Sequence, residues 1–226
     1  MHYSIKSFVL RTGRVSHRQK LALDEWLVHY ELPSPGKEWD LTSAFGRRAD
    51  TVVEIGFGMG DSLVTMAKAS PEINFVGIEV HRAGIGSLVA ALHEEGIQNV
   101  RVAPFDAVEA LKTCIANEGL AGVQIFFPDP WPKKRHQKRR LIQPEFIRML
   151  VDKIKIGGFI HCATDWEDYA AQMLSVLSGE SRLLNAHPEG GFMPRPERRP
   201  LTKFEQRGNR LGHGVWDLMF VRKTLA

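Results

Sequence analysis

Short apolar runs alternate with amphipathic segments along the middle of the chain, and this alternation limits the fold more than any other feature. The runs have the length and β-branched content of strands, and the segments have helical spacing. The expected strands cover residues 51–55, 74–79, 100–104, 122–127 and 159–163, and the expected helices cover 61–70, 82–95, 108–117, 144–154 and 167–177. The pattern predicts βαβ units, and therefore a mainly parallel sheet with helices on both faces.

The two ends of the chain add further elements. A weaker strand is expected over 182–186 and a last strand over 215–221, which brings the expected sheet to seven strands. The last strand follows a loop rather than a helix, so we expect it to run antiparallel at an edge of the sheet. Residues 1–20 are basic and are expected to form a flexible arm, followed by a short helix over 21–30. The predicted parts are therefore an arm with a short helix (1–48) and a main domain (49–226).

Composition narrows the cellular setting. The two cysteines, Cys114 and Cys162, lie far apart and form no C-x-x-C pair, which favours reduced thiols and gives no metal site. No apolar run is long enough to span a membrane, and no apolar segment of a signal peptide follows the basic N-terminus. A cytoplasmic protein without metal or membrane is expected.

Positive charge is concentrated in three clusters although the net charge is only +4. Residues 1–20 hold five Lys or Arg and no acid, residues 133–140 hold six and no acid, and residues 195–210 hold six beside Glu197 and Glu205. Segregation of this kind indicates an anionic partner, and nucleic acid is the first candidate. The alternative is that these side chains are simply solvated.

An acidic residue lies at or near the carboxyl end of each of the first five expected strands. In open parallel sheets ligands bind outside these strand ends, so the five acids are expected to converge on one rim. They are Glu54, Glu79, Asp106, Asp129 and Asp165.

The first expected strand leads into the turn Gly56-x-Gly58-x-Gly60, where missing Cβ atoms let a ligand approach the backbone. Asp61 replaces the last small residue of the dinucleotide-binding pattern, and its charge at a helix N-terminus would repel a pyrophosphate. Glu79 follows at the distance where a carboxylate accepts both ribose hydroxyls. A nucleoside without a pyrophosphate is therefore expected, and S-adenosylmethionine is such a ligand.

Two further residues have open alternatives. Asp106 either receives the adenine amino group or caps the helix that follows it. Trp131, in the stretch F-F-P-D-P-W-P-K-K-R-H-Q-K-R-R over 126–140, either stacks on a flipped base or forms a buried wedge. In the same stretch Asp129 stands between two prolines, at the start of the densest cluster of cations.

Taken together, these motifs resemble the bacterial tRNA (guanine-N7-)-methyltransferase family. The resemblance covers about residues 7–222 and is carried by E-I-G-F-G-M-G, G-I-E, P-D-P-W-P-K-K-R-H, T-D-W-E-D-Y and R-P-x-T-K-F-E-x-R-G. It implies a Rossmann-like class I methyltransferase fold and methyl transfer from S-adenosylmethionine to N7 of a guanine in the variable loop of tRNA.

The resemblance also implies roles for particular residues. Glu54, Glu79, Asp106 and Asp129 match cofactor-binding positions, and the glycines Gly56, Gly58 and Gly60 belong to the same expected site. Lys133, Asp165, Thr202, Lys203, Phe204 and Glu205 match substrate positions. The remaining basic-stretch side chains are expected to contact RNA phosphates; these are Lys134, Arg135, His136, Lys138, Arg139 and Arg140.

Asp129 is the expected catalytic residue. Guanine N7 carries a lone pair and no proton, so an ionised Asp129 is expected to orient the base or to stabilise its developing positive charge, not to remove a proton. The turn also resembles the D/N-P-P-Y/F/W turn of amino-group methyltransferases, which keeps methylation of an exocyclic amine or of another RNA as an alternative. A non-catalytic RNA-binding protein is the other alternative, and both a monomer and a homodimer remain possible.

Overall fold

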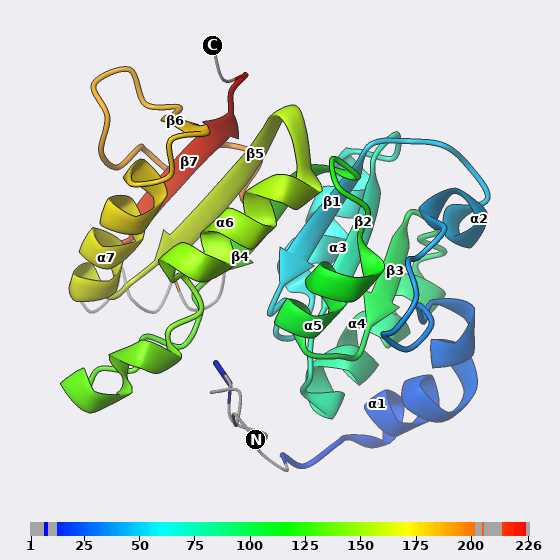
Figure 1. Cartoon of the computed structure of the whole chain (residues 1–226). Coiled ribbons are helices and arrows are strands. Elements are labelled where there is room, and N and C mark those ends of the chain that lie inside the picture. Colours follow the sequence, from blue (N-terminus) through cyan, green and yellow to red (C-terminus); the bar gives the residue numbers. More distant parts are fainter. Residues whose placement is uncertain (1–6, 9–12, 202–204, 206–213, 225–226) are drawn as a thin grey trace.

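One seven-stranded sheet organises the residues that the computed structural model describes, which are 7–8, 13–201, 205 and 214–224 (Figure 1). Its strand order is β3-β2-β1-β4-β5-β7-β6, and β1 to β5 all run parallel to one another. The strands are β1 (Thr51–Ile55), β2 (Asn74–Ile78), β3 (Val100–Ala103), β4 (Leu120–Phe126), β5 (Ile154–Thr164), β6 (Leu183–Asn185) and β7 (Trp216–Arg222).

The expected antiparallel last strand is confirmed, but its place in the sheet differs from the expectation. β7 pairs antiparallel with β5 on one side and with β6 on the other, so β6 forms the edge. β7 is therefore the strand next to this edge, and its Phe220 pairs with Ile160 of β5 and with Asn185 of β6. β6 has only three residues, which suits an edge because a short edge strand offers few unpaired backbone groups.

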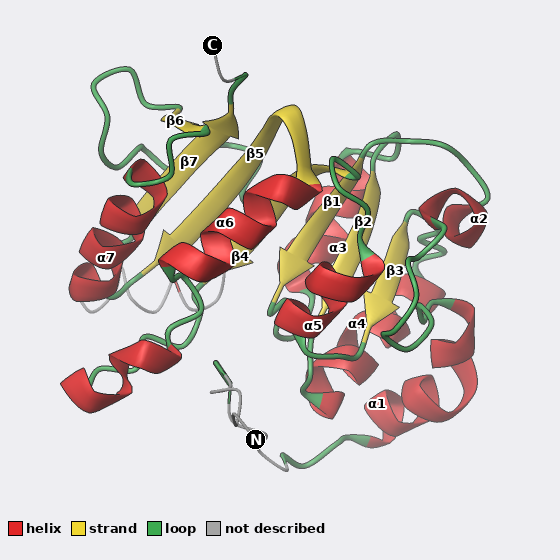
Figure 2. Ribbon diagram, viewed as in Figure 1, coloured by secondary structure: helices red, strands yellow, loops and turns green. Residues whose placement is uncertain are grey.

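Helices cover both faces of the sheet, as Figure 2 shows. They are α3 (Asp61–Ala69), α4 (Arg82–Glu94), α5 (Ala107–Cys114), α6 (Pro144–Lys153) and α7 (Glu167–Ser178). Successive strand side chains point to opposite faces, and Val52 and Val53 of β1 accordingly belong to two separate buried clusters. The Val53 cluster lies under α5, α6 and α7, and the Val52 cluster lies under α3 and α4.

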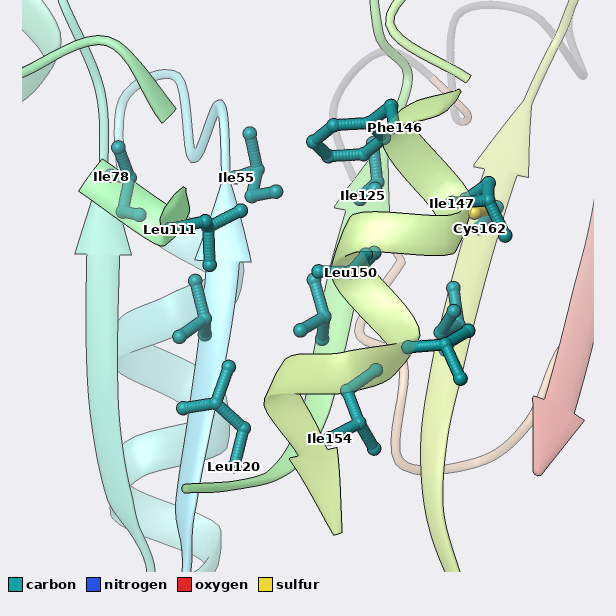
Figure 3. Packing of buried hydrophobic residues seen from close by; sticks show 14 of the residues in the cluster. Ile55, Ile78, Leu111, Leu120, Ile125, Phe146, Ile147, Leu150, Ile154 and Cys162 are labelled. Atoms are coloured by element: carbon teal, nitrogen blue, oxygen red, sulfur yellow. The ribbon is translucent and has the colours of Figure 1, made fainter. Parts of the chain in front are cut away.

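The Val53 cluster packs helices α5 and α6 against strands β1, β2 and β4. Figure 3 shows Leu111 of α5 beside Ile55 and Ile78, and it shows Leu150 of α6 facing the sheet. Full burial of one such aliphatic side chain stabilises the fold by about 1.5–3 kcal/mol. This packing fixes the carboxyl ends of β1, β2 and β4 relative to one another.

Two glycines are placed differently from the expectation. We expected Gly157 and Gly158 to follow the end of a helix at 154, but α6 ends at Lys153 and β5 already begins at Ile154. Ile154 pairs with Leu120, and the register then shifts before Gly122 pairs with Phe159. Gly157 has a φ of +79°, and a Cβ on Gly158 would lie 2.8 Å from the Ala121 carbonyl oxygen. The glycines therefore form an irregularity inside the strand rather than a helix stop.

The expected flexible arm over 1–20 overlaps a helix, because residues 17–20 belong to α1 (His17–Leu21). A helical path begins with α1, continues as the π-helix η1 (Ala22–Trp26) and ends in the 3₁₀ helix η2 (Leu27–His29). Ser16 and Gln19 cap its start reciprocally, and Arg18 pairs with Glu94 of α4 at 2.6 Å. The expected short helix thus starts four residues earlier than 21, because the capping pair and α4 stabilise an added turn.

The chain then continues along the outer edge of the sheet. Leu32 N donates to Val102 O at 2.8 Å, which extends the hydrogen bonding of β3, and α2 (Leu41–Phe45) follows. Within the described ranges, no helix is both long and apolar enough to cross a membrane.

Candidate active site

A pocket of about 760 Å³ opens at the carboxyl ends of β1, β2 and β4. Its size is that of a typical small-molecule site. Three of the five predicted rim acids, Glu54, Glu79 and Asp129, line it. Aromatic and aliphatic side chains supply much of the remaining wall, namely Phe57, Ile78, Phe105, Phe126, Phe127 and Leu141.

The glycine turn after β1 forms one side of this pocket. Gly56, Gly58 and Gly60 have φ values of +73°, +57° and +87°, which side chains disfavour. A Cβ on Gly60 would lie 2.8 Å from the Cβ of Leu88, whereas Gly56 and Gly58 have open space where a Cβ would be. The turn is thus tightly packed toward α4 and open toward the pocket.

Glu79, just past β2, is held by the backbone on both carboxylate oxygens. Its Oε2 accepts from Gly58 N at 3.1 Å, and its Oε1 accepts from Val80 N at 2.7 Å and from His81 N at 3.0 Å. A carboxylate has about four acceptor positions, so capacity remains for a hydroxyl donor from a ligand. The three bonds fix the orientation of the Glu79 carboxylate in the pocket wall.

Glu54 is buried within β1 and has one unsatisfied oxygen. Its Oε1 accepts from the Ser62 hydroxyl at 2.9 Å, while Oε2 has no hydrogen-bond partner among the described residues. Burial raises the pKa of Glu54 to about 7, and the hydrogen bond from Ser62 only partly opposes this shift. An unsatisfied, buried carboxylate in a pocket wall suits a cationic or hydrogen-bond-donating ligand group.

Asp106 caps a helix. Its Oδ1 accepts from Val108 N at 2.9 Å and Glu109 N at 3.2 Å, at the start of α5. The capping alternative is thereby confirmed. The neighbours of Asp106 in the chain, Phe105 and Ala107, line the pocket, while its own role toward a cofactor stays a prediction.

Asp129 is exposed at the pocket on a turn with unusual backbone geometry. Phe127 and Trp131, on either side of Pro128-Asp129-Pro130, have φ values of +51° and +45°. Residues with side chains adopt this left-handed region rarely and with strain. Phe127 N donates to Ala163 O at 2.8 Å, which ties the start of the turn to the end of β5.

Trp131 is half-buried and already engaged within the protein. Its Nε1 donates to Ser7 O at 3.0 Å, and the Arg139 guanidinium lies 3.9 Å above its ring. Arg139 in turn donates to Phe8 O at 3.4 Å. Ser7 and Phe8 line the pocket, a role that nothing in the sequence pattern of the basic N-terminus indicated.

The basic stretch after this turn forms the 3₁₀ helix η3 (Lys134–Arg139). Some of its basic side chains are exposed to solvent and others are partly or fully buried. Lys133, Lys134, Arg135 and Lys138 are exposed, as a phosphate-binding surface requires. His136 is half-buried, and loss of hydration together with the cations around it lowers its pKa. Arg140, by contrast, is only 2% exposed, which leaves little of its side chain available to RNA. Its guanidinium is used inside the protein.

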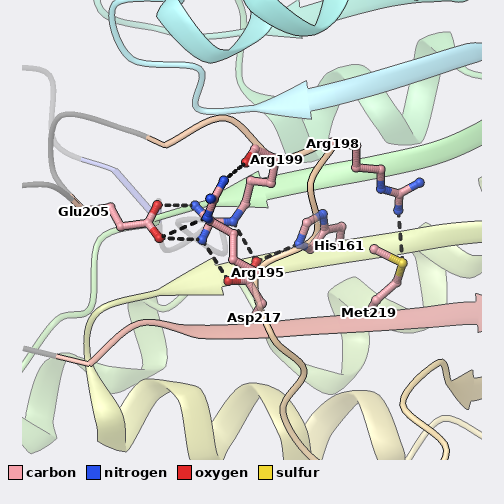
Figure 4. Close-up of polar contacts among 7 residues, drawn as sticks. All are labelled: His161, Arg195, Arg198, Arg199, Glu205, Asp217 and Met219. Atoms are coloured by element: carbon pink, nitrogen blue, oxygen red, sulfur yellow. Dashed lines mark hydrogen bonds and ion pairs between the residues drawn. The ribbon is translucent and has the colours of Figure 1, made fainter. Parts of the chain in front are cut away.

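The substrate positions of the C-terminal half fall in three groups. Asp165 is exposed after β5 and does not line the pocket. Thr202, Lys203 and Phe204 lie outside the described residues. Glu205 is buried and accepts from Arg199 at 2.6 Å and 3.0 Å, as Figure 4 shows. Pro200 and Leu201, next to Arg199, line the pocket.

Arg199 is fully buried, so not every cation of residues 195–210 is available to phosphates. It also bonds to Asp217 of β7, which in turn contacts His161 of β5 at 2.8 Å. Burial alone would raise the pKa of Asp217, but bonds from His161 and Arg199 outweigh burial and lower it. The ionised Asp217 therefore anchors this segment to the sheet. Within the described part of the chain, no three His, Cys, Asp or Glu side chains gather in a way that would hold a metal ion.

Two solved structures with a similar architecture are methyltransferases. The 16S rRNA methyltransferase KamB superposes with a TM-score of 0.60, at 15% identity, over 84% of this chain and 96% of that one. The aminoglycoside resistance methyltransferase NpmB1 gives a TM-score of 0.53 at 14% identity, over 81% and 92% of the two chains. The chain therefore has the class I methyltransferase fold.

Sequence comparison identifies the family. Residues 48–218 match the family model described as "Putative methyltransferase". A tRNA (guanine-N(7)-)-methyltransferase of Legionella pneumophila is 65% identical over 99% of this chain and 100% of its own length. The protein of that name from Bordetella pertussis is 53% identical over 96% and 85% of the two chains. The chain belongs to the tRNA (guanine-N7-)-methyltransferase family.

Proposed function

We propose that the chain carries out its family's reaction at this pocket, with S-adenosylmethionine as methyl donor and N7 of a guanine in the variable loop of tRNA as acceptor. The observation that carries the proposal is the shared pocket of Glu54, Glu79 and Asp129, where the expected donor-binding acids and the expected catalytic acid line one cavity.

The residues present fit the donor. Glu79 has acceptor capacity for the ribose hydroxyls, and the open space at Gly56 and Gly58 lets a ligand approach the backbone. The unsatisfied Oε2 of Glu54 suits the ammonium of the methionine part. Asp61, at the N-terminus of α3 and in the pocket wall, disfavours a ligand with a pyrophosphate. When bound, S-adenosylmethionine supplies an electrophilic methyl group on a positively charged sulfur.

Asp129 acts on the base. Guanine N7 has an in-plane lone pair and no proton, so the protein needs no general base. The tasks left for its side chains are to hold the purine and to stabilise the positive charge that develops on it. Asp129 can accept from the N1–H and N2–H₂ groups of guanine, and its negative charge stabilises the alkylated ring. The exposed Lys133, Lys134, Arg135 and Lys138 bind tRNA phosphates.

Two other functions make different predictions. A methyltransferase acting on an exocyclic amine would use Asp129 to accept a hydrogen bond from that amine. A non-catalytic RNA-binding protein would keep the basic surface and need no donor site, and the unsatisfied Glu54 in the pocket argues against it.

One experiment separates these functions. The purified chain is incubated with S-adenosylmethionine and unmodified tRNA, and the RNA is digested to nucleosides. We expect 7-methylguanosine. A nucleoside methylated on an exocyclic amine, or no methylated product, would overturn the proposal.

A further inference from the structure

Arg140 joins the Asp129 turn to helix α7. Its Nε donates to Pro130 O at 2.7 Å, its Nη1 to Gln172 Oε1 at 2.6 Å and its Nη2 to Asp168 Oδ2 at 2.5 Å. The guanidinium also lies 4.8 Å from the centre of the Tyr169 ring, which is fully buried on α7. The planar guanidinium of Arg140 therefore donates through Nε to the Asp129 turn and through its two Nη atoms to the start of helix α7.

The turn that Arg140 holds is the strained one. Pro130 lies between Asp129 and Trp131, and Trp131 has a φ of +45°. Strained backbone of this kind persists only where surrounding contacts over-determine it. Proline lacks an N–H, so Pro130 O is the group through which its backbone can be held, and the bond it receives is charge-assisted.

The α7 residues that Arg140 contacts are close in sequence to Asp165, which is an expected substrate-binding residue. Asp168, Tyr169 and Gln172 lie in the first two turns of α7, and Asp165 comes just before that helix. The Arg140 guanidinium is thus bonded to the turn that carries the exposed Asp129 and to the helix that follows the exposed Asp165.

We propose that Arg140 is a positioning residue for methyl transfer, which holds the Asp129 turn at a set place relative to the start of α7. The inference rests on the proposed function. Arg140 does not line the pocket, and its part is to keep Asp129 where the base is bound. A displacement of about 1 Å in such a group is enough to lower a rate strongly.

Replacement by lysine separates charge from geometry. An ammonium keeps the positive charge, but it cannot bond at once to Pro130 O, Gln172 and Asp168 in the directions a guanidinium serves. We expect Arg140→Lys to lower kcat for 7-methylguanosine formation by about 10- to 100-fold, while KM for tRNA and the salt dependence of tRNA binding stay within about twofold.

Two variants serve as controls. Arg182→Lys alters a guanidinium with a similar set of partners, Glu180, Asp152 and the Arg148 carbonyl, at the opposite end of the sheet, and it should leave kcat unchanged. Arg135→Ala removes an exposed cation of the same basic stretch and should raise KM for tRNA instead of lowering kcat.

Asp168→Ala keeps the test valid if Arg140→Lys does not fold, because the Asp168 side chain is 63% exposed and tolerates removal. We expect a loss of kcat of about 3- to 10-fold, and less than additive losses when both substitutions are combined.

The outcomes are distinct. A lower melting temperature with unchanged kcat would make Arg140 merely structural and overturn the inference. A raised KM for tRNA with a flatter salt dependence would make it a phosphate contact and also overturn it. Wild-type protein that forms no 7-methylguanosine would overturn the proposed function itself, whereas an active wild type with an equally active Arg140→Lys variant would overturn this inference alone.

Discussion

Arg199 and Asp217 form a bidentate ion pair, with Nε to Oδ1 at 2.7 Å and Nη2 to Oδ2 at 2.8 Å. Both side chains are almost completely buried, and Glu205 binds the remaining edge of the guanidinium (Figure 4). The pair ties the chain just before Pro200 and Leu201 to β7. The position of Pro200 and Leu201 in the pocket wall therefore depends on a buried ion pair, not on apolar packing alone.

Arg199→Met should destabilise the protein strongly, because it removes the buried guanidinium that donates to both Asp217 and Glu205. The expected loss is about 3–5 kcal/mol, which lowers the melting temperature by roughly 6–20 °C in a chain of this size. Lys155→Met removes the exposed pair with Asp50 and serves as control, with an expected loss of at most about 1 kcal/mol. Equal shifts in the two variants, measured by thermal denaturation, would contradict the assigned role of Arg199.

Asp129→Ala should lower kcat by about 100-fold or more, because it removes the carboxylate that stabilises charge on the base. Binding of tRNA and of S-adenosylmethionine should change only a few-fold. Asp129→Asn separates the two tasks of this side chain: if charge dominates, it will be as slow as the alanine variant, and if orientation dominates, it will retain part of the rate. Single-turnover measurements report the chemical step, and near-normal turnover of Asp129→Ala would remove its catalytic role.

Glu79→Gln should weaken binding of S-adenosylmethionine by about 10- to 100-fold, because an amide cannot accept from all the backbone and ribose donors that a carboxylate satisfies. Affinity for tRNA should not change. Glu109→Gln, at an exposed carboxylate of α5, is the matched control. Calorimetric titration of both variants with the donor tests the contrast, and equal affinities would make Glu79 a purely structural residue of the glycine turn.

Glu54 makes stability depend on pH. Its pKa is raised from 4.5 to about 7 in the folded chain, so between these values the unfolded state loses a proton that the folded state keeps. Stability therefore falls as pH rises through this window, by about 3 kcal/mol in total. Glu54→Gln removes this fall, so its melting temperature relative to wild type should increase from about pH 5 to about pH 8.

The exposed Glu72→Gln controls for loss of one negative charge and should show no such trend. A difference between Glu54→Gln and wild type that stays constant across this pH range would contradict the titration of Glu54.

Neutralising Lys134, Arg135 and Lys138 should flatten the salt dependence of tRNA binding, because fewer counterions are released when fewer phosphates are neutralised. The slope should change by about 0.7–0.9 for each phosphate that the variant no longer neutralises. kcat at saturating tRNA should remain within a few-fold, since these exposed side chains lie outside the pocket wall. An unaltered slope in filter-binding assays across a range of salt concentrations would show that η3 does not contact RNA.

Strand and helix positions follow from local patterns, and for this reason they were predictable. A short apolar run identifies β1, which is buried throughout, and helical spacing identifies α3. The strand-end rule then assigns five acids to one edge of the sheet, and three of them, Glu54, Glu79 and Asp129, line the pocket. The position of Gly157 and Gly158 was not predictable in the same way. Their strand conformation depends on pairing with β4, which is distant in sequence.

By itself, the sequence determined the sheet, its carboxyl-end site and the family, because periodicity, strand-end acids and motifs are properties of neighbouring residues. Only the tertiary structure decided which charged residues reach solvent. In the sequence Arg140 and Arg199 resemble the exposed cations beside them, but each is buried among acceptors supplied by distant segments. Burial depends on which segments pack together, and a guanidinium is stable there only when those segments supply its hydrogen-bond partners.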